Sequence, residues 1–280
     1  MATIVSFHAH PDDESIATGG LLARAADAGH RVVLVFATRG ELGEPVPGVL
    51  AEGEQLTLRR TSECYESARV LGVDRVEFLG FTDSGMIGEP TNDAAWCFWQ
   101  ADLDHAARRL AVLLDEEMPE VLTVYDDNGG YGHPDHIRCC EAVTAAFHIA
   151  RGEASQQQNG YAGPQKLYYT AFDQRILQLA LAGFRLARKD ATQFGRNKDI
   201  NLVEIASWPK PVNATIHVGA YLQKKDLASR AHVSQYSGGG PGFLGFMPPA
   251  IRQRLLDWDR FTRAFPPPGS AVEHDLFAGI

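Results

Sequence analysis

The chain has 280 residues, with 26 Lys and Arg against 35 Asp and Glu, which gives a net charge of −9. Hydrophobic residues make up 45% and charged residues 22% of the chain, proportions typical of a folded globular protein that exclude wholesale disorder. The acidic balance counts against nucleic acid and anionic membranes as partners, because both attract an excess of Lys and Arg.

The cysteines and the apolar segments indicate the compartment. The four cysteines have neither CxxC spacing nor the pattern of a secreted disulfide framework, and they stand at Cys64, Cys97, Cys139 and Cys140, so we expect reduced, mostly buried thiols. No apolar stretch approaches the ~18 residues of a membrane span, and no signal-peptide pattern opens the chain. We therefore expect a cytoplasmic protein with no membrane partner. The sequence does not indicate its oligomeric state.

Short apolar runs alternate with longer helical patterns over the first 150 residues. Strands are predicted at 4–7, 32–36, 76–79 and 121–125, and helices at about 21–28, 54–71, 101–117 and 134–150. Parallel strands need helical crossovers, so this alternation predicts an α/β fold with a Rossmann-like, doubly wound and mostly parallel sheet.

The pattern weakens beyond residue 150. It predicts strands at 167–172 and 214–218, a helix at 222–231, and loops at 156–164 and in the Gly-rich segment 237–245. We expect a single domain over residues 1–280, in which residues 1–150 carry the chemistry and the less regular residues 151–280 shape the pocket. The residues do not decide whether 237–245 is a flexible connection or a substrate lid.

Two predicted junctions between a strand and a helix carry unusual polar residues. The first reads HPDDE at residues 10–14, and the second reads NGGYGHPDH at residues 128–136. Part of each motif has a structural explanation, since proline is favoured at the first turn of a helix and aspartate at its start. Ligands of open α/β sheets bind at the carboxyl ends of the strands, where both motifs stand. A dinucleotide site would need glycines at the first junction, whereas His and carboxylates are ligands for a divalent metal.

The spacing of these residues suits a catalytic metal. His10 and Asp13 are three residues apart, as are His133 and His136. These four candidates are at least one more than the three protein ligands of a catalytic zinc, and Asp12 remains as a non-ligating acid. Such a surplus fits metal-assisted hydrolysis, which needs a metal, a base and a group that stabilises an oxyanion.

The paired HPDDE and HPDH motifs resemble the LmbE/PIG-L family of zinc-dependent N-acetylglucosaminyl deacetylases. The similarity covers roughly residues 4–150, with a weaker HxSQ-like stretch at 231–235, and its motifs are HAHPDDES at 8–15, DSGM at 83–86 and NGGYGHPDH at 128–136. Within the family the chain is most similar to the actinobacterial branch. That branch holds the N-acetylglucosaminyl-inositol deacetylase of mycothiol biosynthesis and the mycothiol S-conjugate amidase.

The resemblance implies the roles of the residues in the two motifs. His10, Asp13 and His136 match the metal ligands, and Asp12 matches the general base that takes a proton from the water held by the metal. His133 matches a protonated histidine that stabilises the oxyanion or acts as the general acid.

The resemblance also implies contacts with the substrate. Tyr131 matches a mobile tyrosine that helps to polarise the carbonyl, Arg60 the arginine that holds the polar aglycone, and Asp83 the carboxylate that binds sugar hydroxyls. The glutamate of the family's second-strand loop is either Glu41 or Glu44, and the sequence does not choose between them.

Four further polar residues have structural interpretations. His8 alternates with His10 and is expected to face away from the site, and Asp135 is expected to support a ligand or cap a helix. Glu14 is expected to open a helix at its positive end. For His232, a place in the site wall and a buried structural role are equally compatible with the sequence.

We therefore expect a metal-dependent hydrolase that removes an acetyl or other acyl group from a small N-acylated aminosugar. The expected metal is zinc, with ferrous iron also compatible with His and Asp ligands. A mycothiol S-conjugate amidase and a deacetylase that tailors a natural product are alternatives within the same chemistry. A non-catalytic sugar-binding module is the alternative outside it, and the filled positions of ligand, base and acid argue against that module.

Overall fold

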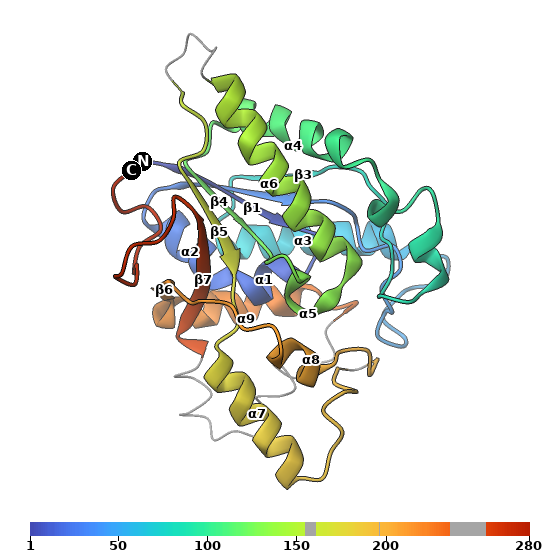
Figure 1. Ribbon diagram of the computed structural model, residues 1–280. Coiled ribbons are helices and arrows are strands. Elements are labelled where there is room, and N and C mark those ends of the chain that lie inside the picture. The colour runs from blue at the N-terminus through green and yellow to red at the C-terminus, as the bar shows by residue number, and fades with distance from the viewer. Residues whose placement is uncertain (155–160, 196, 236–255) are drawn as a thin grey trace.

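The computed structural model describes residues 1–154, 161–195, 197–235 and 256–280 (Figure 1). Its sheet has seven strands in the order β3-β2-β1-β4-β5-β7-β6. Strands β1 to β5 are parallel, and β7 is antiparallel to both of its neighbours. The predicted α/β fold with a mostly parallel, doubly wound sheet is confirmed. The strands are β1 (Thr3–His8), β2 (Arg31–Phe36), β3 (Arg75–Phe78), β4 (Val121–Val124), β5 (Lys166–Thr170), β6 (Ala214–His217) and β7 (Trp258–Phe265).

The helices connect these strands and cover both faces of the sheet. They are α1 (Asp13–Ala17), α2 (Gly19–Asp27), α3 (Leu56–Leu71), α4 (Leu103–Glu117), α5 (Gly129–Gly132), α6 (Pro134–Ala154), α7 (Gln174–Leu186), α8 (Leu202–Ala206) and α9 (Leu222–Ala231). The predicted helix at 222–231 is confirmed. The sequence pattern missed α7, α8 and β7, and the Gly-rich segment 237–245 lies outside the described residues.

Alternation along β1 divides the interior into two cores. Val5 and Phe7 pack with α4 and α6 on one face of the sheet, whereas Ile4 packs with α2, α3 and α9 on the other. Successive side chains of a strand point to opposite faces, and here both faces are covered by helices. Strand β1 is therefore fixed from both sides, which gives the loop after His8 a rigid base.

A smaller cluster lies outside the sheet. Figure 1 shows α7 and α8 beyond the lower edge of the strands, and the two helices pack on each other through Leu177, Leu181, Leu202 and Ile205. Tyr131, from the second sequence motif, packs against this cluster. The α7–α8 cluster thus supports one side of the segment that carries that motif.

The topology locates a site for ligands. The strand order reverses between β1 and β4, which are neighbours in the sheet. A crevice forms at the carboxyl ends of the strands at such a switch point. The segments that follow β1 and β4 are the two His-Pro-Asp motifs, so the fold brings them together.

Two other predictions concern local structure. All four cysteines are buried and free, as expected. Within the described residues, no helix is long and apolar enough to cross a membrane.

The prediction that the prolines of the two motifs start helices holds for Pro134, the first residue of α6, but is wrong for Pro11. Helix α1 begins at Asp13, and the side chain of Asp12 makes no capping hydrogen bond, because Asp12 has a backbone conformation unlike that of an ordinary helix cap.

Candidate metal centre and active site

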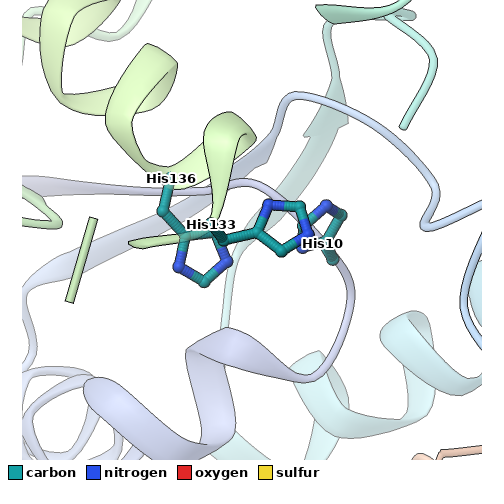
Figure 2. A group of neighbouring side chains, drawn as sticks. All are labelled: His10, His133 and His136. Atoms are coloured by element: carbon teal, nitrogen blue, oxygen red, sulfur yellow. The ribbon is translucent and has the colours of Figure 1, made fainter. Parts of the chain in front are cut away.

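Three histidines from the two motifs meet at the carboxyl end of β1. His10 lies in the loop after β1, His133 directly precedes α6, and His136 lies in the first turn of α6. Figure 2 shows the three rings close together. The ring of His133 is centred 4.6 Å from that of His10 and 4.9 Å from that of His136. All three side chains are buried, and one ring nitrogen of each lies within 4.8 Å of the others.

The hydrogen bond of His136 determines which of its nitrogens is free. Its Nδ1 lies 3.2 Å from the carbonyl oxygen of Gly129, and a carbonyl oxygen only accepts, so Nδ1 carries the proton. Nε2 then holds a lone pair, has no hydrogen-bond partner among the described residues, and lies 3.3 Å from Oδ2 of Asp13. A neutral imidazole whose other nitrogen bonds a carbonyl is the form in which histidine binds metals.

His10 is oriented in the same way by a carboxylate. Its Nε2 lies 3.2 Å from Oδ2 of Asp135 and 3.5 Å from Oδ1 of Asp83, so the proton belongs on Nε2. Its Nδ1 lies 3.5 Å from Oδ2 of Asp13. Burial acts to lower the pKa of His10, but Asp83, Asp13 and Asp135 outweigh burial and raise it well above its ordinary value, so a cation bound at Nδ1 would displace a proton. Asp135 is fully buried and accepts further hydrogen bonds from the backbone and hydroxyl of Ser84, as expected of a residue that supports a ligand.

Asp13 completes the set of donors. Its Oδ2 accepts hydrogen bonds from the hydroxyl of Tyr125 at 2.7 Å and from the backbone N–H of His10 at 3.1 Å. Burial acts to raise the pKa of Asp13, but His136 and His10 outweigh it and hold the pKa well below its ordinary value. The carboxylate of Asp13 and the ring nitrogens of His10 and His136 beside it are the donor types that hold a divalent cation such as Zn²⁺ or Fe²⁺.

His133 differs from the other two histidines. Its Nδ1 accepts a hydrogen bond from the backbone N–H of Asp135 at 3.2 Å, so a neutral ring carries its proton on Nε2. Burial and the nearby His10 and His136 lower the pKa of His133 well below its ordinary value. These surroundings favour a neutral ring, in contrast to the protonated histidine that the resemblance implies.

Asp12 lies beside these donors but outside the set. Burial raises its pKa to about 6, against the opposing charge of Arg60, which suits a general base near neutral pH. Nη2 of Arg60 lies 3.4 Å from Oδ1 of Asp12. The guanidinium also donates to the carbonyl oxygens of Pro11 at 2.5 Å and Gly40 at 2.9 Å. Arg60 therefore holds the loop that carries Asp12, in addition to the contact with a polar aglycone that the resemblance implies.

Asp83, the predicted sugar-binding carboxylate, also makes hydrogen bonds within the protein. Asp83 is buried, and its carboxylate accepts from the backbone N–H groups of Gly85 and Leu42. Glu41 accepts the backbone N–H of Asp83 at 3.0 Å, whereas Glu44 is exposed and lines an open surface cavity of about 300 Å³. Of the two glutamates left open by the sequence, Glu41 is the one that lies at Asp83.

Comparison with known proteins identifies the family of this chain. The family model PIG-L, described as GlcNAc-PI de-N-acetylase, matches residues 5–147. The chain belongs to the PIG-L family. It is 36% identical to a 1D-myo-inositol 2-acetamido-2-deoxy-alpha-D-glucopyranoside deacetylase of Acidothermus cellulolyticus, over 99% of this chain and 95% of that protein. A protein of the same name from Thermobifida fusca is also 36% identical, over 97% of each chain.

Solved structures show the same fold. The N,N'-diacetylchitobiose deacetylase of Pyrococcus horikoshii superposes with a TM-score of 0.62 at 18% identity, covering 94% of this chain and 83% of that one. A conserved protein of Thermus thermophilus gives 0.60 at 21% identity, covering 95% and 96%. The relatives at 36% identity are named as deacetylases. The prediction that this PIG-L chain is an enzyme, a hydrolase acting on an amide, is confirmed.

The PIG-L site contains residues that the sequence reasoning did not assign to it. Tyr125 holds both Asp13 and the backbone N–H of Ala9, and its only sequence signal is its position at the end of a strand. His8 is structural as predicted, with its Nε2 near the hydroxyls of Ser6 and Thr18, and burial lowers its pKa to about 4. The ring of the predicted Tyr131 lies 4.9 Å from that of His136.

Proposed function

We propose that this chain is a metal-dependent deacetylase that removes an acetyl or other acyl group from an N-acylglucosaminyl substrate, with His10, Asp13 and His136 holding the cation. One observation carries the proposal. Nδ1 of His10 and Nε2 of His136 lie 3.5 and 3.3 Å from Oδ2 of Asp13. The proton positions that follow from Asp135 and Gly129 leave these two nitrogens free to bind a cation.

The proposed cation is zinc, and the same ligands suit ferrous iron. When bound, it would supply a Lewis acid that activates water and polarises the amide carbonyl. Asp12, with its raised pKa, would accept the proton of the attacking water. A positioned base of this kind contributes roughly 10²–10⁴-fold to a rate.

His133 and Tyr131 are proposed to act on the substrate carbonyl, and Asp12 is proposed to return a proton to the leaving amine. The Nε2–H of neutral His133 would donate a hydrogen bond to the oxygen on which negative charge develops. The departing amine must gain a proton to leave, and the proton that Asp12 takes from the attacking water is the one available to it. Tyr131 lies on the other side of the histidine cluster, against α7 and α8, where its hydroxyl would reach the same oxygen after a small movement.

The proposed substrate is an N-acetylglucosaminyl-inositol, the substrate named for the relatives at 36% identity. Arg60, Asp83 and Glu41 would bind its hydroxyl groups, since Arg60 lies at Asp12, Asp83 lies at His10, and Glu41 accepts the backbone N–H of Asp83. We propose that residues 1–280 form one domain for this purpose and that the enzyme acts in the cytoplasm, where its four free thiols stay reduced. A mycothiol S-conjugate or an N-acylated natural product is the alternative substrate within the same chemistry.

A panel of N-acylated glucosaminides tests the proposal. The purified chain would be loaded with Zn²⁺ or Fe²⁺ and incubated with N-acetylglucosaminyl-inositol, a mycothiol S-conjugate, N-acetylglucosamine and a long-chain N-acyl glucosaminide. Mass spectrometry then identifies the bond that is cleaved. Loss of an acetyl group from the inositol glycoside, absent in His10→Ala, supports the proposal. A chain that binds no divalent metal and turns over none of these compounds contradicts it.

A further inference from the structure

The backbone of Asp12 has an unusual conformation. Its φ is 118° and its ψ is −33°, a region that residues with a side chain rarely adopt. Such conformations are strained and persist only where the surroundings hold them. The structure must therefore contain contacts that fix Asp12, and these contacts also aim its carboxylate.

Glu14 provides the contact with the amide of Asp12. Its Oε2 accepts the backbone N–H of Asp12 at 2.9 Å. Its Oε1 accepts the hydroxyl of Ser67 at 2.5 Å and lies 2.7 Å from Nε2 of His232. Glu14 is fully buried, and a carboxylate without water is costly unless it is paired and hydrogen-bonded. Nε2 of His232 is the imidazole donor among these contacts.

His232 reaches Glu14 from the far end of the chain. It follows α9, which packs on α1 and α3, and its side chain is 1% exposed. The segment has a second, separate anchor, because the backbone N–H and the hydroxyl of Ser234 both donate to Glu63 of α3, at 2.9 and 2.6 Å. The chain around His232 is thus held independently of the imidazole.

We propose that His232 is a positioning residue for Asp12. Through Glu14 it holds the Asp12 amide, maintains the strained backbone and keeps the carboxylate aimed at the attacking water. This inference rests on the proposed function for the role of Asp12. It also explains why a histidine of the C-terminal half, distant from both sequence motifs, is buried against the first of them.

A matched pair of substitutions tests the role of the imidazole. In His232→Gln the amide nitrogen takes the place of Nε2 and still donates to Glu14. In His232→Asn the side chain has the same polarity but is one methylene too short. We expect His232→Asn in the metal-loaded enzyme to lower kcat roughly ten- to a hundredfold, the scale of a small misplacement of a catalytic group. KM and metal stoichiometry should change little, and His232→Gln should recover most of kcat.

Lys225→Met is the control for stability. Lys225 lies on α9, the helix that His232 follows, and forms a partly buried ion pair with Asp259 at 2.7 Å, away from Asp12. Its loss should lower stability without lowering kcat. Hydrogen exchange of the peptide that contains Asp12 gives a readout independent of turnover, and it should accelerate in His232→Asn alone.

Each outcome decides a separate question. Equal kcat in His232→Asn, His232→Gln and the wild type overturns the inference, as does a loss of kcat in Lys225→Met that matches its loss of stability. Unchanged hydrogen exchange at Asp12 in His232→Asn overturns it even if the wild type proves inactive. Inactivity of the wild type on all substrates contradicts the proposed function instead.

Discussion

Nε2 of His10 lies 3.2 Å from Oδ2 of the fully buried Asp135. The two residues come from different motifs, one after β1 and one in the first turn of α6. The contact keeps a proton on Nε2 of His10, so that Nδ1, which lies near Asp13, is the nitrogen left to bind a cation. Such carboxylate–histidine pairs orient metal ligands and raise their basicity.

Asp135→Asn should therefore weaken metal binding. The amide is isosteric, but it is a poorer acceptor and no longer stabilises the N–H of His10. Loss of such a partner typically costs about 10- to 100-fold in metal affinity or activity, and we expect a rise of this size in the Kd for Zn²⁺, measured by competition with a chromophoric chelator. Asp259→Asn is the control, since Asp259 is also a buried carboxylate that accepts a backbone N–H. Equal affinities of the two variants would exclude the supporting role of Asp135.

Asp12→Asn should separate catalysis from metal binding. Asparagine retains the volume of the side chain and cannot accept a proton, so we expect kcat to fall by about 10²–10⁴-fold. Metal content, measured by atomic emission, should stay at the wild-type level, whereas His10→Ala should lose the metal. Activity of Asp12→Asn within tenfold of the wild type would show that another group is the base.

The parts of the fold that follow from the sequence are those with strong local patterns. The parallel strands β1 to β4 are short apolar runs, and their alternation with helices predicts the doubly wound sheet and the crevice between β1 and β4. The switch point then brings together His10, Asp13, His133 and His136, which are far apart in sequence. The prediction that these four residues meet rests on the topology alone.

The elements that the sequence reasoning missed depend on tertiary contacts. Strand β7 has the sequence WDRFTRAF, which includes charged residues, and it lies next to the edge strand β6. It forms because β5 and β6 pair with it on either side. The tautomers of the histidines are equally invisible in sequence, since they depend on the carbonyl of Gly129 and the backbone N–H of Asp135. The contact of His232 with Glu14 joins residues 218 positions apart, and no local spacing predicts it.

Gly129→Ala should damage the metal site through the backbone. Gly129 has a φ of +63°, and an added Cβ would lie 2.8 Å from Cβ of His136 and 2.9 Å from the backbone nitrogen of Ile137. Its carbonyl is also the partner of Nδ1 of His136. We expect a lower melting temperature and weaker metal binding, because His136 must move. Calorimetry and a metal titration measure the two effects.

Gly29→Ala is the matched control for this substitution. Gly29 has a similar φ of +78°, but an added Cβ meets nothing within 4 Å. It should therefore show only the backbone strain, about 1–2 kcal/mol, with unchanged metal affinity. If the melting temperature and the metal affinity change equally in Gly129→Ala and Gly29→Ala, the collision at His136 is relieved without displacing its ring.

The ion pair of His232 and Glu14 should give a stability contribution that depends on pH. Burial alone would lower the pKa of His232, but the charge of Glu14, its hydrogen bond and the charge of Asp12 outweigh burial and the opposing Arg60, so the pKa is raised. A histidine whose pKa is raised by folding stabilises the native state fully below its unfolded pKa of about 6.5. This contribution is lost as pH rises through the higher pKa of the folded state.

The difference in the free energy of unfolding between the wild type and His232→Gln should therefore be largest near pH 6 and shrink as pH rises. One titrating group limits the slope to about 1.4 kcal/mol per pH unit. Urea unfolding at intervals between pH 5.5 and 9.5 measures this difference, and subtraction of the two curves removes the contributions of all other groups. Ser234→Ala removes a neutral donor from the same segment and should give a difference that is constant with pH. A difference for His232→Gln that is equally constant, or that grows with pH, would mean that His232 is neutral in the folded protein and holds Glu14 as an uncharged donor.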